Sequence, residues 1–341
     1  MTAPNRKAFV EVQFNWVFVL IVGAIILIFF VSIVNSQKKQ SDKNLAFDVL
    51  SNIDLILSSG LTVPKTGQIF DMPRLEFDSD CNSLTVFGVT RQFPDKIVFA
   101  PSKLKGLKLV VWSQDWNVPF KVTNFLYITT SDVRYIFVKP TGDASKVELL
   151  YNNTPNITKD LVTDLSGLVD KNNYKIRIVY FGSEIPTNPQ LPSSSFITKM
   201  ANEDVTAVLV NPTGKYVNFY KKNGNNFVQS GNNYYYLEDP SIYGAIFAEN
   251  EEVYVCSMEK AFKRLYYVSK ILSERETALK SAYGGSICQG LRADNQMNSI
   301  KTSAYNANVS KQDEFISIGT SESELIASNQ NNLENSCPSI Y

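Results

Sequence analysis

The chain has 341 residues, and its 33 Lys and Arg residues are balanced by 33 Asp and Glu residues, so the formal net charge is zero. This length is enough for one large domain or two small ones beside a membrane segment, and the lack of a basic excess argues against nucleic acid as a partner. The sequence contains no histidine, which excludes Ser-His-Asp and Cys-His catalysis and removes the commonest zinc ligand.

The first predicted element is a membrane helix at 14–35, preceded by a short cytoplasmic segment at 1–13. Its core, WVFVLIVGAIILIFFVSIV at 16–34, carries no charge and is long enough as a helix to cross the hydrocarbon core of a bilayer. Basic residues lie on both sides of it, so their distribution does not decide the orientation. We expect the larger domain outside the cell because it combines an even number of cysteines with glycosylation sequons.

An amphipathic stalk helix is predicted at 36–60, because Leu45, Val49, Ile53 and Leu57 recur at helical spacing without an intervening Gly or Pro. Gly60 then stops the pattern. We therefore predict one continuous helix on the order of 70 Å long, half in lipid and half packed beneath the domain.

Residues 61–255 are predicted to form a β-rich α/β ectodomain with a mixed sheet. Short β-branched and aromatic runs bounded by turn residues indicate the strands. A helix is predicted at 158–170 from the spacing of Leu161, Leu165 and Leu168. Followed directly by a strand, this helix predicts at least one βαβ unit and a parallel strand pair. The predicted strands lie at 84–89, 96–100, 108–112, 120–129, 133–138, 175–181, 205–210, 215–220, 233–237 and 243–248.

The segments DVRYIFVKPTGD at 132–143 and DVTAVLVNPTGK at 204–215 share six of twelve residues. One interpretation is a duplicated strand-and-turn unit. The other is that Pro-Thr-Gly is favourable turn chemistry after any apolar strand.

The C-terminal part, 256–341, is predicted to be helical and polar, which makes the whole chain an α+β protein. The four cysteines allow three disulfide connectivities in an oxidising compartment. Cys288 and Cys337 bracket a segment with few apolar residues, which would gain most from a covalent link. We therefore favour Cys288–Cys337, with Cys81–Cys256 as the second pair.

Three motifs in the sequence resemble chemical or binding sites. Ser257 and Lys260 have the S-x-x-K spacing of serine acyltransferases, but the KTG sequence precedes them instead of following. Asp78, Asp80 and Asn82 alternate as in a calcium loop, but Ser83 replaces the required glycine, so a solvated acidic turn is expected. Tyr234–Tyr236 suggest cross-strand packing rather than a binding surface. No cofactor or metal site is predicted.

The sequence contains three N-x-S/T sequons, at Asn152, Asn156 and Asn308. They fit a glycosylated outer surface, although an Asn-rich chain also produces sequons by chance.

The sequence Arg6-Lys7-Ala8-Phe9 ahead of the apolar helix resembles the processing site of archaeal type IV prepilins. The resemblance implies cleavage between Ala8 and Phe9, which would make Glu11 the third residue of the mature chain.

Three longer segments, EVQFNWVFVLIVGAIILIFF, FAPSKLKGLKLVVWSQDWNVPFKVTNFLYITTSDVRYI and NSCPSIY, resemble a group of uncharacterised single-pass membrane proteins of small-genome archaea. That resemblance implies a membrane location and no particular activity.

These patterns together predict a non-enzymatic, membrane-anchored cell-envelope protein that acts in surface structure, assembly or partner binding. Its expected partners are membrane lipid and other envelope proteins or further copies of itself, bound through the N-terminal helix. The alternative is a ligand-binding sensor or carrier ectodomain tethered to the membrane.

Overall fold

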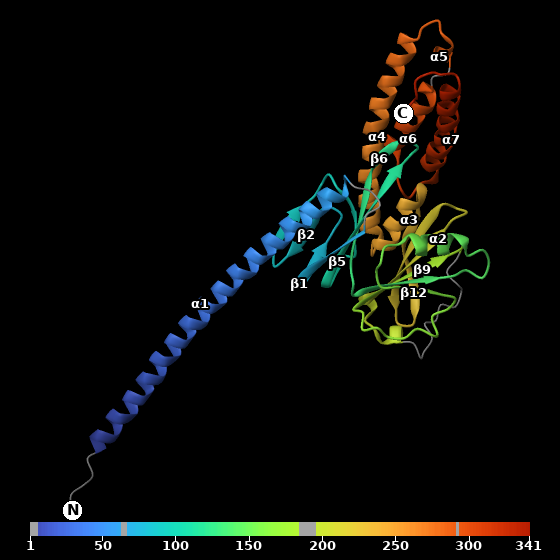
Figure 1. Ribbon diagram of the computed structural model, residues 1–341. Helices are drawn as coiled ribbons and strands as arrows, with labels where there is room; N and C mark the ends of the chain where they lie inside the picture. Colours follow the sequence, from blue (N-terminus) through green and yellow to red (C-terminus); the bar gives the residue numbers. More distant parts are fainter. Residues whose placement is uncertain (1–5, 63–66, 184–195, 291–292) are drawn as a thin grey trace, which may run out of the picture.

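The computed structural model describes residues 6–62, 67–183, 196–290 and 293–341, with side chains from Trp16 onward. It has the predicted α+β architecture: a long N-terminal helix, two six-stranded sheets and a group of C-terminal helices (Figure 1). The core of the protein lies between the two sheets and on the outer face of each.

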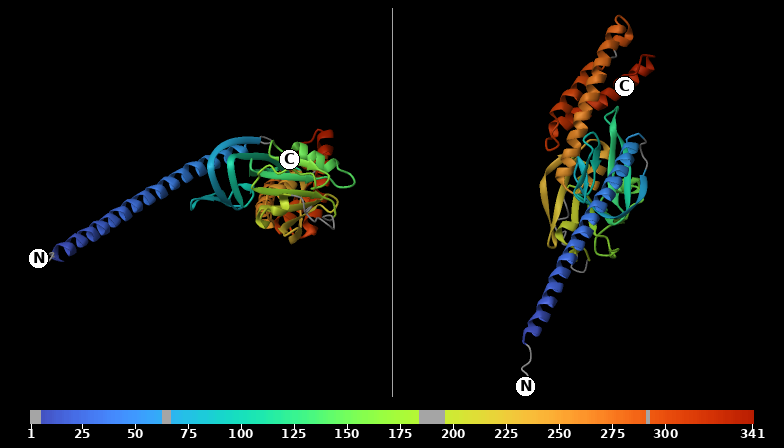
Figure 2. Two further views of the ribbon diagram at one scale, coloured as in Figure 1. Left: turned by 90° about the horizontal axis from the view of Figure 1, so that it is seen from below. Right: turned by 90° about the vertical axis from the view of Figure 1, so that its left-hand side faces the viewer.

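The N-terminal helix α1 (Arg6–Gly60) is continuous, as the sequence predicts, and at 1.5 Å per residue its 55 residues span about 80 Å. Its N-terminal half stands free of the rest of the chain in every view, and only its last turns contact the body (Figure 2). The helix ends at Gly60, the glycine that the sequence marks as its stop.

The first sheet has the strand order β3-β2-β1-β5-β6-β4. All neighbouring pairs are antiparallel except β4 with β6. Its strands are β1 (Gly67–Ser79), β2 (Ser83–Val86), β3 (Val89–Gln92), β4 (Ile97–Phe99), β5 (Lys103–Asn117) and β6 (Lys121–Thr130).

The single strand predicted at 84–89 is in fact the hairpin of β2 and β3. Phe87 and Gly88 both have positive φ, 49° and 75°, as the central residues of a tight hairpin turn require. The chain therefore reverses in the middle of an apparently uninterrupted apolar run.

The second sheet has the order β12-β11-β10-β9-β7-β8. Strands β8, β7, β9 and β10 are parallel, and β11 and β12 continue antiparallel, so the predicted mixed sheet with parallel pairs is present. Its strands are β7 (Val133–Val138), β8 (Lys159–Val162), β9 (Lys175–Phe181), β10 (Val205–Asn211), β11 (Tyr216–Asn223) and β12 (Asn226–Tyr235).

The helix predicted at 158–170 was wrong. Residues Lys159–Val162 form the edge strand β8, and the helix of the strand-helix-strand unit is instead α2 (Ser145–Asn153). Asp164 accepts a hydrogen bond from the backbone N–H of Ser166, a local turn that competes with helix formation. Leu165 is buried beside Ile136 and Ile178, so the apolar spacing reflects a loop crossing the sheet.

The strand predicted at 243–248 was also wrong, because this segment belongs to helix α3 (Glu238–Phe247). The helix lies between the two sheets and contacts β5 and β6 on one side and β10 on the other. Every residue from Ser241 to Phe247 is buried. A helix covered on all sides has no polar face, so periodicity cannot distinguish it from a buried strand.

The long helix α4 (Glu251–Ala282) follows α3 and begins between the sheets, against β4, β6 and β12. Its C-terminal half extends beyond them and packs with α6 (Asp294–Asn306), which in turn packs with α7 (Gln312–Glu334), in an arm at the end of the molecule away from the start of α1 (Figure 1). Three short elements, α5 (Ile287–Gly290), η1 (Phe196–Lys199) and η2 (Asn202–Asp204), complete the described structure.

The two segments that share PTG form strands of one sheet. β7 and β10 both pair in parallel with β9, so they have the same direction. Beyond the shared turn they diverge, because β7 leads into α2 whereas β10 turns back directly into β11. The similarity therefore covers one strand and its turn, and not the element that follows.

Candidate functional site

The most prominent functional feature is the exposed apolar half of α1. None of its most apolar segment is buried against the rest of the protein. Side chains such as Trp16, Ile28 and Phe29 are 61–69% exposed, far more than a soluble surface tolerates in one continuous patch. By length and composition, this helix is able to cross a membrane.

One face of this apolar half carries a shallow groove that begins at Gly23 and is called the Gly23 groove below. The groove is lined by Ile26, Leu27, Phe30 and Val34, which recur at the spacing of one helix face. A Cβ placed on Gly23 would meet no atom within 4 Å. Small residues of this kind let two membrane helices approach closely.

The other half of α1 is seated on the first sheet. Ala46, Leu50, Ile53 and Leu57 are 0–4% exposed, and their spacing of four, three and four residues keeps them on one face. Alternate residues of β5 and β6, including Val111 and Ile128, complete this core cluster. Of the residues that predicted the amphipathic stalk, Ile53 and Leu57 lie in this contact, whereas Leu45 is exposed and Val49 is half-buried, so the buried face is completed by Ala46 and Leu50.

Two ion pairs of Asp54, called the latch below, reinforce this apolar contact of α1 with the first sheet, called the seat below. Asp54 binds Arg91 at 2.6 Å and also Lys96, with its own side chain 18% exposed. Burial favours a raised pKa for Asp54, but hydrogen bonds and charge from Lys96 and Arg91 outweigh it and hold that pKa below the ordinary value. The carboxylate is therefore ionised at neutral pH.

The end of α1 is fixed to the same sheet. The side-chain amide of Asn124 on β6 donates to the carbonyl oxygens of Gly60 and Leu61 at 3.3 and 2.9 Å. These bonds satisfy carbonyl groups that a helix end leaves without a partner. Seat, latch and cap together hold α1 in a defined direction relative to the domain.

The proposed processing residues Arg6, Lys7, Ala8 and Phe9 lie in the first turns of α1, but their side chains lie outside the described part. Residues 1–5 are not described. Whether the chain is cut between Ala8 and Phe9 is not tested by the structure.

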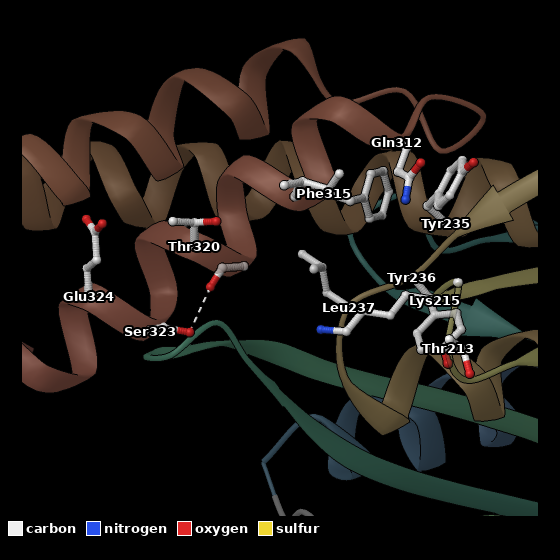
Figure 3. A pocket seen from close by; sticks show the side chains of 13 residues that line it. Thr213, Lys215, Tyr235, Tyr236, Leu237, Gln312, Phe315, Thr320, Ser323 and Glu324 are labelled. Carbon is white, nitrogen blue, oxygen red and sulfur yellow. Dashed lines mark hydrogen bonds between the residues drawn. The ribbon is translucent and has the colours of Figure 1, made fainter.

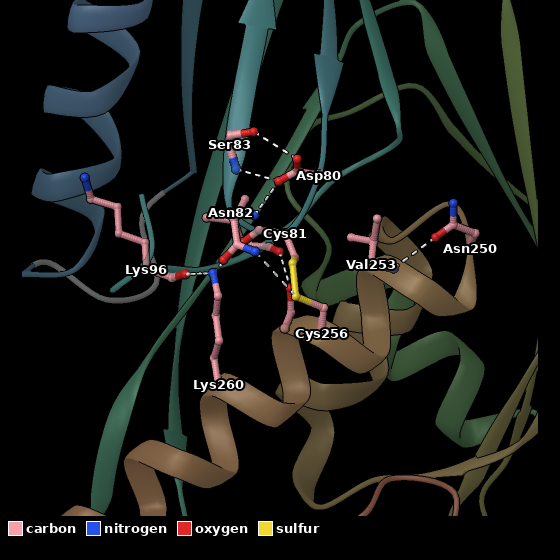
Figure 4. The surroundings of a disulfide bond; sticks show 11 residues. Asp80, Cys81, Asn82, Ser83, Lys96, Asn250, Val253, Cys256 and Lys260 are labelled. Carbon is pink, nitrogen blue, oxygen red and sulfur yellow. Dashed lines mark hydrogen bonds between the residues drawn. A yellow bond between two sulfur atoms is a disulfide. The ribbon is translucent and has the colours of Figure 1, made fainter. Parts of the chain in front are cut away.

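The structure joins Cys81 to Cys256 and Cys288 to Cys337, with Cα–Cα distances of 6.1 and 5.5 Å. These are the two pairs favoured from the sequence. The first connects the turn after β1 to the first turns of α4 (Figure 4). The second closes the arm by joining α5 to the segment that follows α7.

The motifs set aside in the sequence have structural roles. Ser257 donates to the carbonyl of Val98 at 2.6 Å, and Lys260 donates to the carbonyls of Cys81 and Lys96. Because both groups bind backbone oxygens, they do not form a nucleophile and base pair. Asp80 accepts from the backbone of Asn82 and Ser83 (Figure 4), forming the expected acidic turn.

A buried polar junction between the two sheets was missed by the sequence interpretation. Lys175 of β9 binds Glu249 at 2.7 Å, with side chains only 6% and 11% exposed. Ser102, from the first sheet's side, donates its N–H to the same carboxylate at 2.8 Å. Burial favours a raised pKa for Glu249, but the charge and hydrogen bond of Lys175 and the bonds from Ser102 keep it below the ordinary value.

Arg177 extends this junction. It is 3% exposed and donates to the carbonyls of Ala245 at 2.8 Å and Glu249 at 3.0 Å, at the C-terminus of α3 where a cation is favoured. The alternation of Lys175 and Arg177 with isoleucines in KIRIVYF was the available signal. Charges inside a strand of a buried parallel sheet require buried partners.

The three sequon asparagines, Asn152, Asn156 and Asn308, are exposed. Asn152 lies in the last turn of α2, whereas Asn156 follows that helix and Asn308 lies in the loop between α6 and α7. The two loop positions are the more accessible to a glycosylating enzyme.

A pocket of about 550 Å³ lies between α7, the β10–β11 turn and the end of β12 (Figure 3). Thr213 and Gly214 of the second PTG turn line it, but the first PTG turn does not. The pocket therefore does not lie between the two similar segments, which is where a duplicated carrier domain would place it. Tyr235 and Tyr236 line it, and Tyr236 belongs with Tyr234 to the buried core.

Within the described residues, no group of three His, Cys, Asp or Glu side chains is placed to hold a metal ion. Compared with protein-family models, with curated proteins and with solved structures, the chain matches none of them.

Proposed function

We propose that this is a non-enzymatic, membrane-anchored protein of the cell envelope whose N-terminal helix is an assembly element as well as an anchor. The observation that carries the proposal is the single unbroken helix α1, exposed and apolar in one half and seated on the first sheet in the other. Its partners in this proposal are membrane lipid and the same helix of neighbouring copies.

A simple tether does not need a rigid connection between membrane and domain. Here the polar residues 35–44, NSQKKQSDKN, remain helical between the apolar half and the seat. The latch at Asp54 and the cap from Asn124 fix the helix end. A rigid stalk transmits the orientation of the membrane helix to the domain, which is useful when copies pack in a regular array.

The direction of the Gly23 groove supports packing between copies. At about 100° per residue, the face formed by Gly23, Leu27 and Phe30 lies roughly 160° around α1 from the face formed by Leu50 and Leu57. The groove thus points away from the side on which the domain sits. Two α1 helices can meet along it with their domains on the outside.

The disulfides support an oxidising location for the domain. We infer that the domain lies outside the cell and that residues before the span lie in the cytoplasm. The likeness of Arg6–Phe9 to archaeal prepilins extends this proposal to a pilin-like component, processed between Ala8 and Phe9 and incorporated into a surface structure.

The test compares Gly23→Leu with Ser32→Leu in the full chain, purified from membranes in mild detergent. Both changes add the same apolar side chain to the span, but Ser32 lies on the opposite face from the groove. We expect Gly23→Leu to convert assemblies to single copies in native gels and light scattering, and Ser32→Leu to leave them intact. Wild-type protein that is monomeric in membranes would contradict the assembly proposal.

A further inference from the structure

The pocket on α7 has a chemical character that the assembly role does not explain. Its floor is formed by the buried side chains of Tyr236, Leu237 and Phe315, which are 3–5% exposed. The ring of Tyr235 lies beside that of Phe315, with centroids 6.0 Å apart and planes tilted by 47°. Tyr236, Leu237 and Phe315 therefore form a closed apolar base, and the half-buried ring of Tyr235 on β12 is the more exposed aromatic surface of the pocket (Figure 3).

The rim of the pocket is polar but carries little net charge. Thr213, Gln312, Thr320 and Ser323 contribute hydroxyl and amide groups, and Lys215 and Glu324 contribute one positive and one negative charge. Hydroxyl and amide groups both donate and accept hydrogen bonds. Such a rim suits a neutral ligand whose own groups also donate and accept, rather than a phosphate or a metal ion.

We propose that this pocket binds a neutral saccharide of one or two rings. A pyranose has an apolar face of C–H bonds that stacks on aromatic rings, and hydroxyl groups at its edge that pair with amide and hydroxyl side chains. The volume of about 550 Å³ is within the range of small-ligand sites. This inference goes beyond the assembly role and does not depend on it.

One source of such a saccharide is the glycosylation sequon next to the pocket. The sequon at Asn308 is four residues before Gln312, and the carbonyl of Val309 accepts a hydrogen bond from the N–H of Tyr235 at 2.7 Å. A glycan on Asn308 would start beside the rim. The ligand is thus either a free saccharide or the chain's own glycan, and the two sources share one chemistry.

Gly319 gives a way to block the pocket without breaking the fold. It lines the pocket within α7, and a Cβ at this position meets nothing within 4 Å. Replacing a mid-helix glycine favours the helix, so Gly319→Leu fills the cavity while α7 is retained. Ala327→Leu is the matched control because Ala327 is exposed on the same helix outside the pocket.

The test uses unglycosylated full-length protein in a detergent without a sugar headgroup. The probes are glucose, mannose, galactose, N-acetylglucosamine, cellobiose and diacetylchitobiose, titrated by saturation-transfer NMR. We expect saturable binding of at least one probe with a Kd in or below the millimolar range, weakened at least about tenfold by Gly319→Leu and by Gln312→Ala. Ala327→Leu should bind as the wild type does.

The proposal is overturned if no probe binds saturably or if binding survives Gly319→Leu unchanged. Binding of a tripeptide mixture that Gly319→Leu removes, without saccharide binding, would also overturn it and assign the pocket to peptide. Glycosylated protein distinguishes the two sources. If the Asn308 glycan occupies the pocket, added probe binds weakly to the glycosylated protein and Asn308→Gln restores binding; with a free saccharide, Asn308→Gln has no effect.

Discussion

Asp54 of α1 and Lys96, the residue before β4, form an ion pair that joins the stalk helix to the first sheet. Arg91 forms a second ion pair with the other carboxylate oxygen of Asp54. The pair lies beside the apolar seat of Ile53 and Leu57. Together with the apolar contact and the hydrogen bonds from Asn124, these ion pairs hold α1 against the domain.

We expect Asp54→Asn to loosen the stalk. Because the folded pKa of Asp54 is lowered, its stabilising contribution is present above the ordinary pKa and is lost as the pH falls through the folded value. The partly exposed pair should contribute about 1 kcal/mol at pH 7. Hydrogen exchange of residues 46–60 measures the opening. Asp48→Asn, at an exposed position on the same helix, is the control and should change nothing.

The two disulfides determine which peptides should remain linked when the unreduced protein is digested. Digestion without reduction should give linked peptides for Cys81–Cys256 and Cys288–Cys337, which are 175 and 49 residues apart. Removing the second pair as Cys288→Ser with Cys337→Ser should lower the free energy of unfolding by about 2–4 kcal/mol, since the closed loop no longer limits the unfolded chain. Peptides linking Cys81 to Cys288 or Cys337 would show that the pairing is different.

We expect the buried ion pair of Lys175 and Glu249 to contribute more to the free energy of unfolding than an exposed ion pair does. Glu249→Gln leaves Lys175 buried without a counter-charge, so we expect a loss of about 3–5 kcal/mol in the free energy of unfolding. Glu76→Gln removes a pair with Lys103 in which the side chains are 50% and 60% exposed, and the expected change is under about 1 kcal/mol. Equal losses in urea unfolding would mean that the Lys175–Glu249 pair is not buried.

At Glu322 of α7 we expect stability to depend on pH in the opposite direction to that at Asp54. Burial and the negative charge of Glu238 raise the pKa of Glu322, and the positive charge of Lys215 opposes them only in part. The pKa rises from 4.5 to about 7. Its favourable contribution is complete below the ordinary pKa and is lost as the pH rises through about 7. Glu322→Gln should therefore stabilise the protein at pH 8 by about 1 kcal/mol, allowing for solvent screening, and have little effect at pH 4. Glu324→Gln, at an exposed position, should not change this pH dependence.

Local patterns were sufficient for some elements of this fold. The helical spacing that ends at Ile53 and Leu57 predicted that this half of α1 has one buried and one exposed face, but it placed Leu45 on the buried face, where the structure has Ala46 instead. The β-branched strands at 133–138 and 175–181 were found with the bounds that β7 and β9 have. In each case the local environment is regular along the whole element.

The failures have physical causes as well. Helix α3 is buried on every side, so YGAIFA has no polar face to reveal its period. The apolar residues at 161–168 belong to an edge strand and to the loop that crosses the sheet after it. They contact the sheet at intervals that happen to equal those of a helix. The junction of Glu249 with Lys175 and Ser102 joins residues from distant parts of the chain, and no local pattern predicts such a meeting.

The most direct test of the assembly role of α1 is cysteine cross-linking between copies in native membranes, since the four natural cysteines are already paired. Phe30→Cys places a thiol in the Gly23 groove, and Ser32→Cys places one on the opposite face of α1. We predict that mild oxidation gives a covalent dimer with Phe30→Cys and none with Ser32→Cys. Equal cross-linking of both, or of neither, would contradict assembly through this face.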